Sequence, residues 1–123
     1  MEPKKRVLVV DDEPCILRFA SVNLSLEGYD VMTAGNGEDA LALARQEKPD
    51  IMLLDVLMEP LTGFDVLARL RDFSRMPVIV FTARSDIGNM AIAEGACDFI
   101  AKPFKMEEMT SKIKTALDGD GVG

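Results

Sequence analysis

The sequence predicts an α/β fold in which five parallel strands form one sheet with helices on both faces. Short apolar runs such as residues 51–54 (IMLL) are typical of strands that are buried on both faces, as they are inside parallel sheets. Segments with helical spacing of apolar residues alternate with these runs along the chain. This alternation predicts right-handed crossovers between parallel strands, and 123 residues are enough for one domain with a single core.

Up to the central strand, the predicted elements have recognisable start and stop residues. The strand at residues 6–10 is rich in Val and ends at three acidic residues, after which Pro14 suits the first turn of a helix. That helix keeps its apolar spacing to Leu26, and Gly28 provides the stop expected just beyond a helix end. A short strand at residues 30–34 leads through an Asn-Gly turn into a helix that a Lys-Pro pair closes.

The second half of the chain repeats this alternation. After the central strand Ile51–Asp55, the pattern predicts a helix at 64–70, a strand at 78–81, a short helix at 86–94, a strand at 99–101 and a last helix at 106–117. Gly88 weakens the fourth of the five helices, and Gly95 stops it. We expect one domain over residues 1–117, with residues 118–123 forming a flexible tail or the start of a linker.

The composition describes a folded chain without histidine. Hydrophobic residues make up 48% and charged residues 28%, which excludes a disordered protein. The absence of His removes the commonest general base, the Ser-His and Cys-His nucleophile pairs and most kinds of zinc site. The net charge of −7 argues against unaided binding to nucleic acid or anionic lipid, because their phosphates would be repelled.

The cellular location is predicted from what the sequence lacks. No signal-peptide pattern follows the basic start, and no apolar run approaches membrane-spanning length. Cys15 and Cys97 are far apart and lack the spacing of metal ligands, so we expect free thiols in a reducing compartment. These features predict a cytoplasmic protein that does not enter the membrane.

Five polar residues stand at the carboxyl ends of predicted strands. They are Asp11, Asp12, Asp55, Thr82 and Lys102. In a parallel sheet these ends share one edge, and ligands of open α/β sheets bind at that edge. Taken singly, each residue has a structural explanation, since Asp is common in turns and helix caps and most lysines are solvated. Their shared position makes a functional site the better interpretation.

The residue types at this edge fit phosphoryl transfer. Three nearby carboxylates repel one another, so they need a cation or raised pKa values. An all-oxygen site suits Mg²⁺, which takes one or two carboxylates plus phosphate oxygens and leaves another carboxylate free to react. With Lys102 and the Thr82 hydroxyl on phosphate oxygens, Asp55 can attack phosphorus in line and form an acyl phosphate without a general base.

At these residues the sequence resembles the receiver domain of two-component response regulators, over residues 5–117. The resemblance rests on five pieces in order: VVDDEP at residues 9–14, LLDVLM at 53–58, Gly63, FTAR at 81–84 and KPF at 102–104. It implies a flavodoxin-like, doubly wound five-stranded sheet of strand order 2-1-3-4-5. It also implies that a sensor histidine kinase or a phosphotransfer protein phosphorylates Asp55.

The resemblance assigns the metal ligands. It implies that Asp12, Asp55 and the backbone carbonyl of Leu57 hold Mg²⁺, with Asp11 acting mainly through water. Leu57 and Arg84 lie where side chains flank the path of an attacking water, and neither orients water as a base would. We therefore predict slow self-dephosphorylation.

The resemblance also assigns the phosphoryl-binding and switch residues. Thr82 and Lys102 would contact the phosphoryl group, and Phe99 matches an aromatic position that turns inward when Thr82 moves. The bond from Lys102 to Pro103 matches a cis peptide bond of the family. A downstream protein or output domain would bind the face made by the fourth helix, fifth strand and fifth helix. The chain itself would be a monomer or a weak phosphorylation-dependent dimer.

The chain departs from the family pattern in three places. Glu59 stands where the family commonly has proline, and Pro60 follows, so we expect a reshaped loop near the metal. The segment from Thr82 to Lys102 is shorter than the common pattern, which predicts a weakened fourth helix. Positions that are often charged in receivers that dimerise are here Met90, Ala93, Cys97 and Met106. We interpret these four residues as a more apolar partner surface.

Three alternatives share part of the pattern. A pseudo-receiver would be an interaction module that is never phosphorylated. A phosphohydrolase that works through an aspartyl phosphate usually carries a second Asp two residues after the nucleophile, where this chain has Leu57. A flavin-binding module needs a hydroxyl- or glycine-rich phosphate loop after the first strand, where this chain has three acidic residues. The sequence leaves the pseudo-receiver as the strongest rival.

Overall fold

The computed structural model describes residues 4–122, with side chains through Asp118. Strands and helices alternate along this part of the chain: β1 (Arg6–Val10), α1 (Pro14–Leu26), β2 (Asp30–Ala34), α2 (Gly37–Glu47), β3 (Ile51–Asp55), α3 (Gly63–Leu70), β4 (Val78–Thr82), α4 (Ser85–Ala93), β5 (Asp98–Ala101) and α5 (Met106–Val122). The predicted alternation is therefore confirmed, including the fourth helix, which is short but formed.

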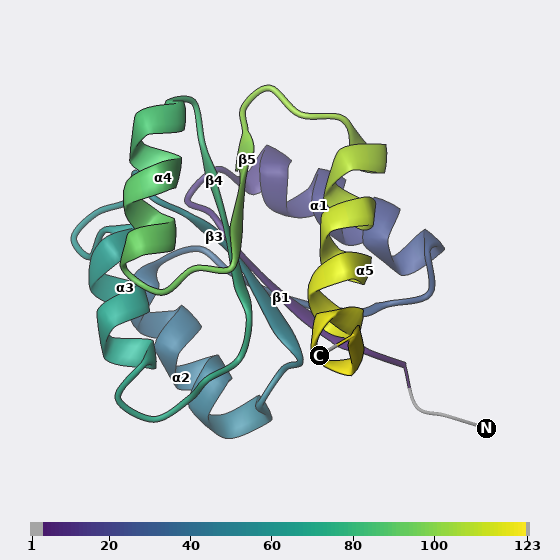
Figure 1. Cartoon of the computed structure of the whole chain (residues 1–123), viewed down its shortest axis with the longest axis horizontal. Coiled ribbons are helices and arrows are strands. Elements are labelled where there is room, and N and C mark those ends of the chain that lie inside the picture. The colour runs from purple at the N-terminus through teal and green to yellow at the C-terminus, as the bar shows by residue number, and fades with distance from the viewer. Residues whose placement is uncertain (1–3, 123) are drawn as a thin grey trace.

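The strands form one parallel sheet in the order β2-β1-β3-β4-β5. This is the doubly wound, flavodoxin-like order that the family resemblance implies. Figure 1 shows α1 and α5 on one side of the sheet and α2, α3 and α4 on the other. Because every strand runs in the same direction, the carboxyl ends of β1, β3, β4 and β5 meet at one edge, and β3 lies between β1 and β4.

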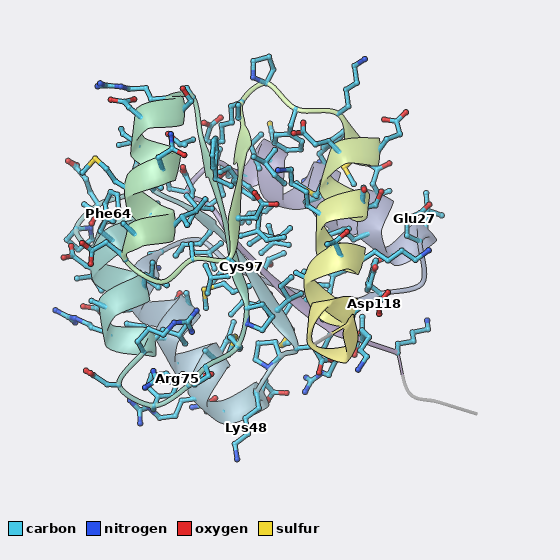
Figure 2. The ribbon with its side chains drawn as sticks, in the orientation of Figure 1. Glu27, Lys48, Phe64, Arg75, Cys97 and Asp118 are labelled. Atoms are coloured by element: carbon cyan, nitrogen blue, oxygen red, sulfur yellow. The ribbon has the colours of Figure 1, made fainter. Side chains whose placement is uncertain are left out.

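Both faces of the sheet are buried, so the core has two halves. Successive residues of β3 alternate between them: Ile51 and Leu53 pack toward α1 and α5, whereas Met52 and Leu54 pack toward α2, α3 and α4. All four are fully buried. Figure 2 shows how side chains fill the space between the sheet and the two helix layers. A strand with apolar residues on both faces needs such a sandwich, which explains the uninterrupted apolar runs in the sequence.

The helix ends agree with the predicted stops, with one exception. The backbone at Gly28 has φ +96° and that at Gly95 has φ +116°, a conformation that favours glycine, so both follow their helices as expected. Helix α5, however, continues to Val122, beyond the predicted end at residue 117. The prediction relied on glycines near the end of the chain, and a glycine costs a helix only about 1 kcal/mol, which the preceding packed turns can override.

Cys15 and Cys97 are both free and both exposed. No helix in the part of the chain that the structure describes is long and apolar enough to cross a membrane.

Candidate functional site

Two acidic residues of the site are positioned by the ends of the two central strands. Asp11 follows β1 directly, and its backbone N–H donates to the carbonyl of Ala34 at 3.2 Å, so the strand pairing continues to this residue. Its side chain is fully buried, and its Oδ1 accepts from the Glu13 backbone N–H at 2.9 Å. Asp55 ends β3 and is 4% exposed. Both are charged groups held at the edge of a buried sheet.

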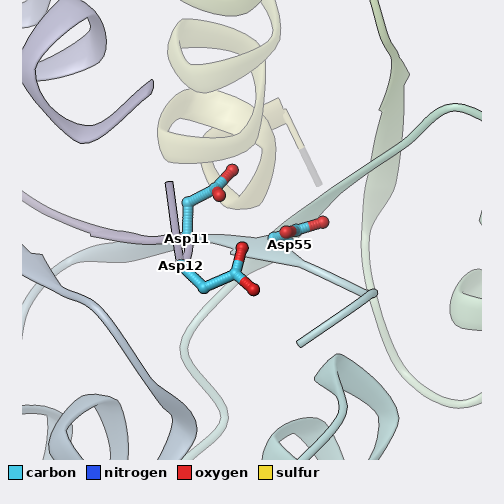
Figure 3. Close-up of side chains that lie close together, drawn as sticks. All are labelled: Asp11, Asp12 and Asp55. Atoms are coloured by element: carbon cyan, nitrogen blue, oxygen red, sulfur yellow. The ribbon is translucent and has the colours of Figure 1, made fainter. Parts of the chain in front are cut away.

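Asp12 completes a cluster of three carboxylates. One oxygen from each of Asp11, Asp12 and Asp55 lies within 4.8 Å of the others. Figure 3 shows Asp11 and Asp12, which come from the same loop, beside Asp55 at the end of β3. Asp12 is exposed, whereas the other two are buried, so the cluster opens to water on one side. A donor set made only of carboxylate oxygens, with room for water, fits a hard divalent cation such as Mg²⁺.

The cluster disturbs the ionisation of Asp55. Its pKa is raised from 3.8 to about 6, first because burial penalises the charged form and second because of the negative charge on Asp11. The positive charge of Lys102 and the backbone N–H of Leu57, which donates to Asp55 Oδ1 at 3.3 Å, act in the opposite direction but do not compensate. The site therefore carries more negative charge than its own groups neutralise, as a cation-binding site should.

Lys102 is the cation that faces this cluster. Its Nζ donates to Asp11 Oδ2 at 3.2 Å and lies 3.6 Å from Asp55 Oδ1. Burial lowers the pKa of Lys102, but Asp55 and Asp11 together outweigh burial, so the pKa is raised. The ammonium group stays charged beside the carboxylate that the sequence singles out.

Two aromatic rings, to which no sequence pattern assigned a role, lie next to Lys102. The ring of Phe104, two residues further on, stacks on the buried ring of Phe81 with centroids 5.7 Å apart. The Nζ of Lys102 lies 5.6 Å from the Phe81 centroid, and the Lys102 backbone N–H donates to the Thr82 carbonyl at 2.9 Å. The KPF run and the Phe before Thr82 were visible in the sequence, but only the fold shows that their rings meet. The bond before Pro103 is cis, as the resemblance implies.

Thr82 is the last residue of β4, one position beyond Phe81, which is the register partner of Asp55, and it is 1% exposed. Its Oγ1 accepts from the Arg84 backbone N–H at 3.1 Å. Phe99, by contrast, lies on β5 and packs against α4, away from the carboxylates. The structure thus brings Asp11, Asp12, Asp55 and Lys102 together, places Thr82 on the adjoining strand, and keeps Phe99 outside the cluster.

The predicted apolar partner surface is only partly present. Met90 is 56% exposed, and Ala93 at the end of α4 and Cys97 just before β5 are exposed as well. Met106 is different, because it is half-buried at the start of α5 and packs with the core cluster on the α1 side. Met106 is therefore not the exposed methionine that the sequence predicted at this surface, because its side chain packs toward α1.

Gly63 fixes the distance between α3 and the end of β3. A methyl group on Gly63 would lie 2.6 Å from the Asp55 carbonyl oxygen and 2.7 Å from the Val56 Cα, and both of these are backbone atoms. The Gly63 N–H donates to the Val56 carbonyl at 2.8 Å, which holds the two segments together. Only glycine allows this approach beside the candidate site.

We expect Gly63→Ala to lower the free energy of unfolding by about 2–3 kcal/mol, because the new methyl group must displace backbone rather than a flexible side chain. Urea denaturation followed by circular dichroism measures this loss. Gly35→Ala is the matched control, since a methyl group there meets no atom within 4 Å. Equal midpoints for the two variants would contradict the prediction.

Comparisons with known proteins agree with the fold and with the motifs. The family model described as the response regulator receiver domain matches residues 7–114. The transcriptional regulatory protein KdpE of Mycobacterium tuberculosis is 42% identical over 113 residues, which cover 90% of this chain and 50% of that protein. The probable transcriptional regulator ycf27 of Guillardia theta is 40% identical over 119 residues, covering 95% of this chain and 47% of that protein. The chain spans about half the length of these curated relatives.

Solved structures show the same similarity in three dimensions. A CheY-like response regulator receiver domain protein from Methanospirillum hungatei superposes with a TM-score of 0.90 at 29% identity, covering 98% of this chain and 100% of that one. The chemotaxis protein CheY4 of Vibrio cholerae superposes with a TM-score of 0.85 at 30% identity, covering 93% of this chain and 99% of that one.

Proposed function

Because this chain belongs to the response regulator receiver domain family, we propose that it accepts a phosphoryl group on Asp55 from the phosphohistidine of a sensor histidine kinase or a phosphotransfer protein. The curated relatives are named as transcriptional regulators, which supports a role in the control of transcription through a further output region or partner. In this proposal the receiver converts phosphorylation into a change of surface that the output recognises.

One observation carries the proposal. Asp55 is a buried carboxylate at the end of the central strand, with Lys102 Nζ 3.6 Å from its Oδ1 and the carboxylates of Asp11 and Asp12 beside it. A carboxylate flanked by one ammonium group and by two further carboxylates is suited to meet a phosphoryl group together with a divalent cation. An Asp that merely began a turn would not need these neighbours.

The proposed reaction moves one phosphoryl group. An oxygen of Asp55 attacks phosphorus, the P–N bond of the phosphohistidine breaks, and the electron pair of that bond leaves with the imidazole nitrogen of the donor. The product is an acyl phosphate on Asp55. Lys102 and the Thr82 hydroxyl contact the phosphoryl oxygens, and the aromatic stack behind Lys102 keeps its ammonium group in place. No group of this chain has to remove a proton.

The residues present fit Mg²⁺, and the proposal assigns its ligands. Asp12, Asp55 and the Leu57 carbonyl would hold the ion, with Asp11 acting through water. When bound, Mg²⁺ supplies positive charge that stabilises the phosphoryl oxygens during transfer. Shifting the receiver from 1% to 99% in its active conformation needs about 5.5 kcal/mol of difference in binding free energy between the two conformations. Charge-assisted hydrogen bonds from Lys102 and Thr82 to the phosphoryl group are suited to supply much of this free energy.

The test is the intact mass of the protein after incubation with acetyl phosphate or phosphoramidate, with and without Mg²⁺. We expect the wild type to gain one phosphoryl group only with Mg²⁺, and Asp55→Ala to gain none. Asp72→Ala, which removes an exposed carboxylate outside the cluster, is the matched control and should gain the group as the wild type does. Absence of any gain in the wild type would favour a pseudo-receiver, with the loop at residues 59–60 as the first segment to examine.

We also predict that the acyl phosphate persists for minutes rather than seconds. Leu57 is 61% exposed at the mouth of the site, and the Arg84 guanidinium pairs with Asp86, Nη2 to Oδ2, at 2.8 Å. Neither side chain offers a carboxylate or amide oxygen that could orient a water molecule. The decay of the phosphorylated mass at neutral pH with Mg²⁺ measures the lifetime, and a half-life of seconds would contradict the prediction.

For the output surface, we propose that exposed Met90, Ala93 and Cys97 beside β5 form the apolar part of the partner site. Methionine is unbranched and polarisable, so it adapts its shape to a partner, which suits a protein-binding surface. Met90→Lys should weaken phosphorylation-dependent binding of the output partner without changing the phosphoryl gain. Unchanged binding of the output partner, measured by its co-purification with the phosphorylated wild type and variant, would refute this role.

A further inference from the structure

Gly88 lies in the middle of α4 and is buried against β5. A methyl group on this residue would lie 2.3 Å from Cδ2 and 2.4 Å from Cγ of the Phe99 ring. Carbon atoms in contact lie about 3.5–4.0 Å apart, so the ring occupies the space that any other residue would need. Gly88 lowers the helix propensity of α4, but its missing side chain leaves a notch in the surface of the helix, and the Phe99 ring fills this notch.

Lys112 of α5 also contacts Phe99 and its neighbour Asp98. Lys112 Nζ lies 5.9 Å from the ring centroid and donates to both the Phe99 carbonyl oxygen and Asp98 Oδ1 at 3.0 Å. The backbone of Phe99 is thus fixed by pairing in β5 and by Lys112, whereas its ring rests on α4. Any movement of α4 relative to β5 must change the space available to the ring.

Helix α4 is connected to Thr82 by two consecutive hydrogen bonds. The helix has no side-chain cap of its own, and its N-cap residue Arg84 donates its backbone N–H to Thr82 Oγ1 at 3.1 Å. The Arg84 carbonyl in turn accepts from the Gly88 N–H at 3.2 Å. If the Thr82 hydroxyl turns toward a phosphoryl group on Asp55, the bond to Arg84 must lengthen or change direction, and the first turn of α4 is then free to shift.

We propose that Gly88 is a positioning residue: its missing side chain leaves the notch in α4 that seats the Phe99 ring in the unphosphorylated protein, so the size of residue 88 sets how far the ring can move when the first turn of the helix shifts. This inference rests on the proposed phosphorylation of Asp55. A single methyl group on residue 88 would occupy the notch and displace the Phe99 ring from α4.

The test compares Gly88→Ala with the wild type by NMR of the Phe99 ring, assigned with Phe99→Leu, before and after phosphorylation by phosphoramidate and Mg²⁺. We expect the methyl group to move the ring resonances in the unphosphorylated variant. The further change on phosphorylation should fall to less than half of that in the wild type, while intact mass shows the same phosphoryl gain. Gly35→Ala is the control and should leave both signals unchanged.

Ring resonances of Gly88→Ala that coincide with those of the wild type, and an undiminished response to phosphorylation, would overturn the proposal. If the wild type itself gains no phosphoryl group, the proposed function fails. The notch is still tested in that case by the unphosphorylated comparison.

Stability supplies a second measurement in case Gly88→Ala folds poorly. In the wild-type background the methyl group should lower the urea midpoint, because it displaces the ring. In a Phe99→Ala background the same methyl group should raise the midpoint, because Ala is the better helix former and no ring is left to displace. The same sign in both backgrounds would overturn the notch.

Discussion

Replacing Asp55 with Asn is expected to raise the free energy of unfolding of the metal-free protein by about 2–3 kcal/mol at pH 7. The reason is that burial and the charge of Asp11 raise the pKa of Asp55 from 3.8 to about 6, so holding this carboxylate ionised in the folded state is unfavourable. The Asn side chain has nearly the same shape and carries no charge. Urea denaturation of both proteins in a chelating buffer measures the difference.

The difference should depend on pH in a defined direction. Between about pH 4 and 6 the folded protein retains the Asp55 proton, whereas the unfolded chain has released it. The contribution of this group to stability is therefore fully present below pH 4 and is lost as the pH rises through about 6. The gap between the wild type and Asp55→Asn should close at pH 4 and reach its maximum above pH 7.

Two controls separate this effect from a general change of charge. Asp12→Asn removes a charge from the same cluster at an exposed position and should give a smaller gain. Mg²⁺ should stabilise the wild type more than Asp55→Asn, by about 2.7 kcal/mol at a hundredfold excess over its dissociation constant if the variant no longer binds it. Equal free energies of unfolding of the wild type and Asp55→Asn from pH 4 to 8 would show that ionisation of Asp55 does not destabilise the folded protein.

The opposite result is expected for Lys102→Met. Its ammonium group lies 3.2 Å from the fully buried carboxylate of Asp11 and 3.6 Å from Asp55, so its loss leaves two buried charges without a cation. Breaking a buried ion pair costs about 3–5 kcal/mol, and because the Lys102 side chain is 22% exposed, we expect a loss near 2–3 kcal/mol. The pKa of Asp55 should rise further, since Lys102 lowers it in the wild type.

The same variant should also be a poor phosphoacceptor. Removing one group that stabilises developing charge lowers rates by about 10²–10³-fold, and we expect a loss of that order in the initial rate with acetyl phosphate and Mg²⁺. Lys105→Met, an exposed lysine of the same loop, is the control for both measurements. Combining Lys102→Met with Asp55→Asn should restore only part of the stability, because the buried carboxylate of Asp11 stays without its cation, and none of the phosphorylation. Similar behaviour of Lys102→Met and Lys105→Met would rule out the assigned role.

The sequence predicts the strands and the location of the site because both depend on local pattern. Residues 51–55 are apolar on both faces and end in a charge, so their burial and the position of Asp55 follow from the run itself. Once the strands are known to be parallel, Asp11 and Lys102 must lie at the same edge although they are 91 positions apart. The candidate site is thus largely a consequence of topology.

The sequence could not predict which side chains of different helices and strands pack against each other. Gly88 looked like a defect in a helix, because helical propensity describes the residue and not the Phe99 ring that it accommodates. Met106 was grouped with Met90 because both fell at positions expected on one face, yet α5 turns Met106 toward α1. The spacing of residues along a helix shows which side chains share one face of that helix. Which neighbouring element that face contacts depends on how α5 packs on the sheet.

The two outer strands of the sheet affect whether copies of the protein associate with one another at high concentration. Strands β2 and β5 leave one row of backbone groups each without a partner strand, and such rows are where a second molecule can add a strand. Strand β5 has four residues and runs into Pro103 shortly after its end, while β2 begins with the exposed charge of Asp30. Short length, proline and charge all discourage pairing between edges. We therefore expect copies of this protein to have little tendency to pair through the edges of their sheets.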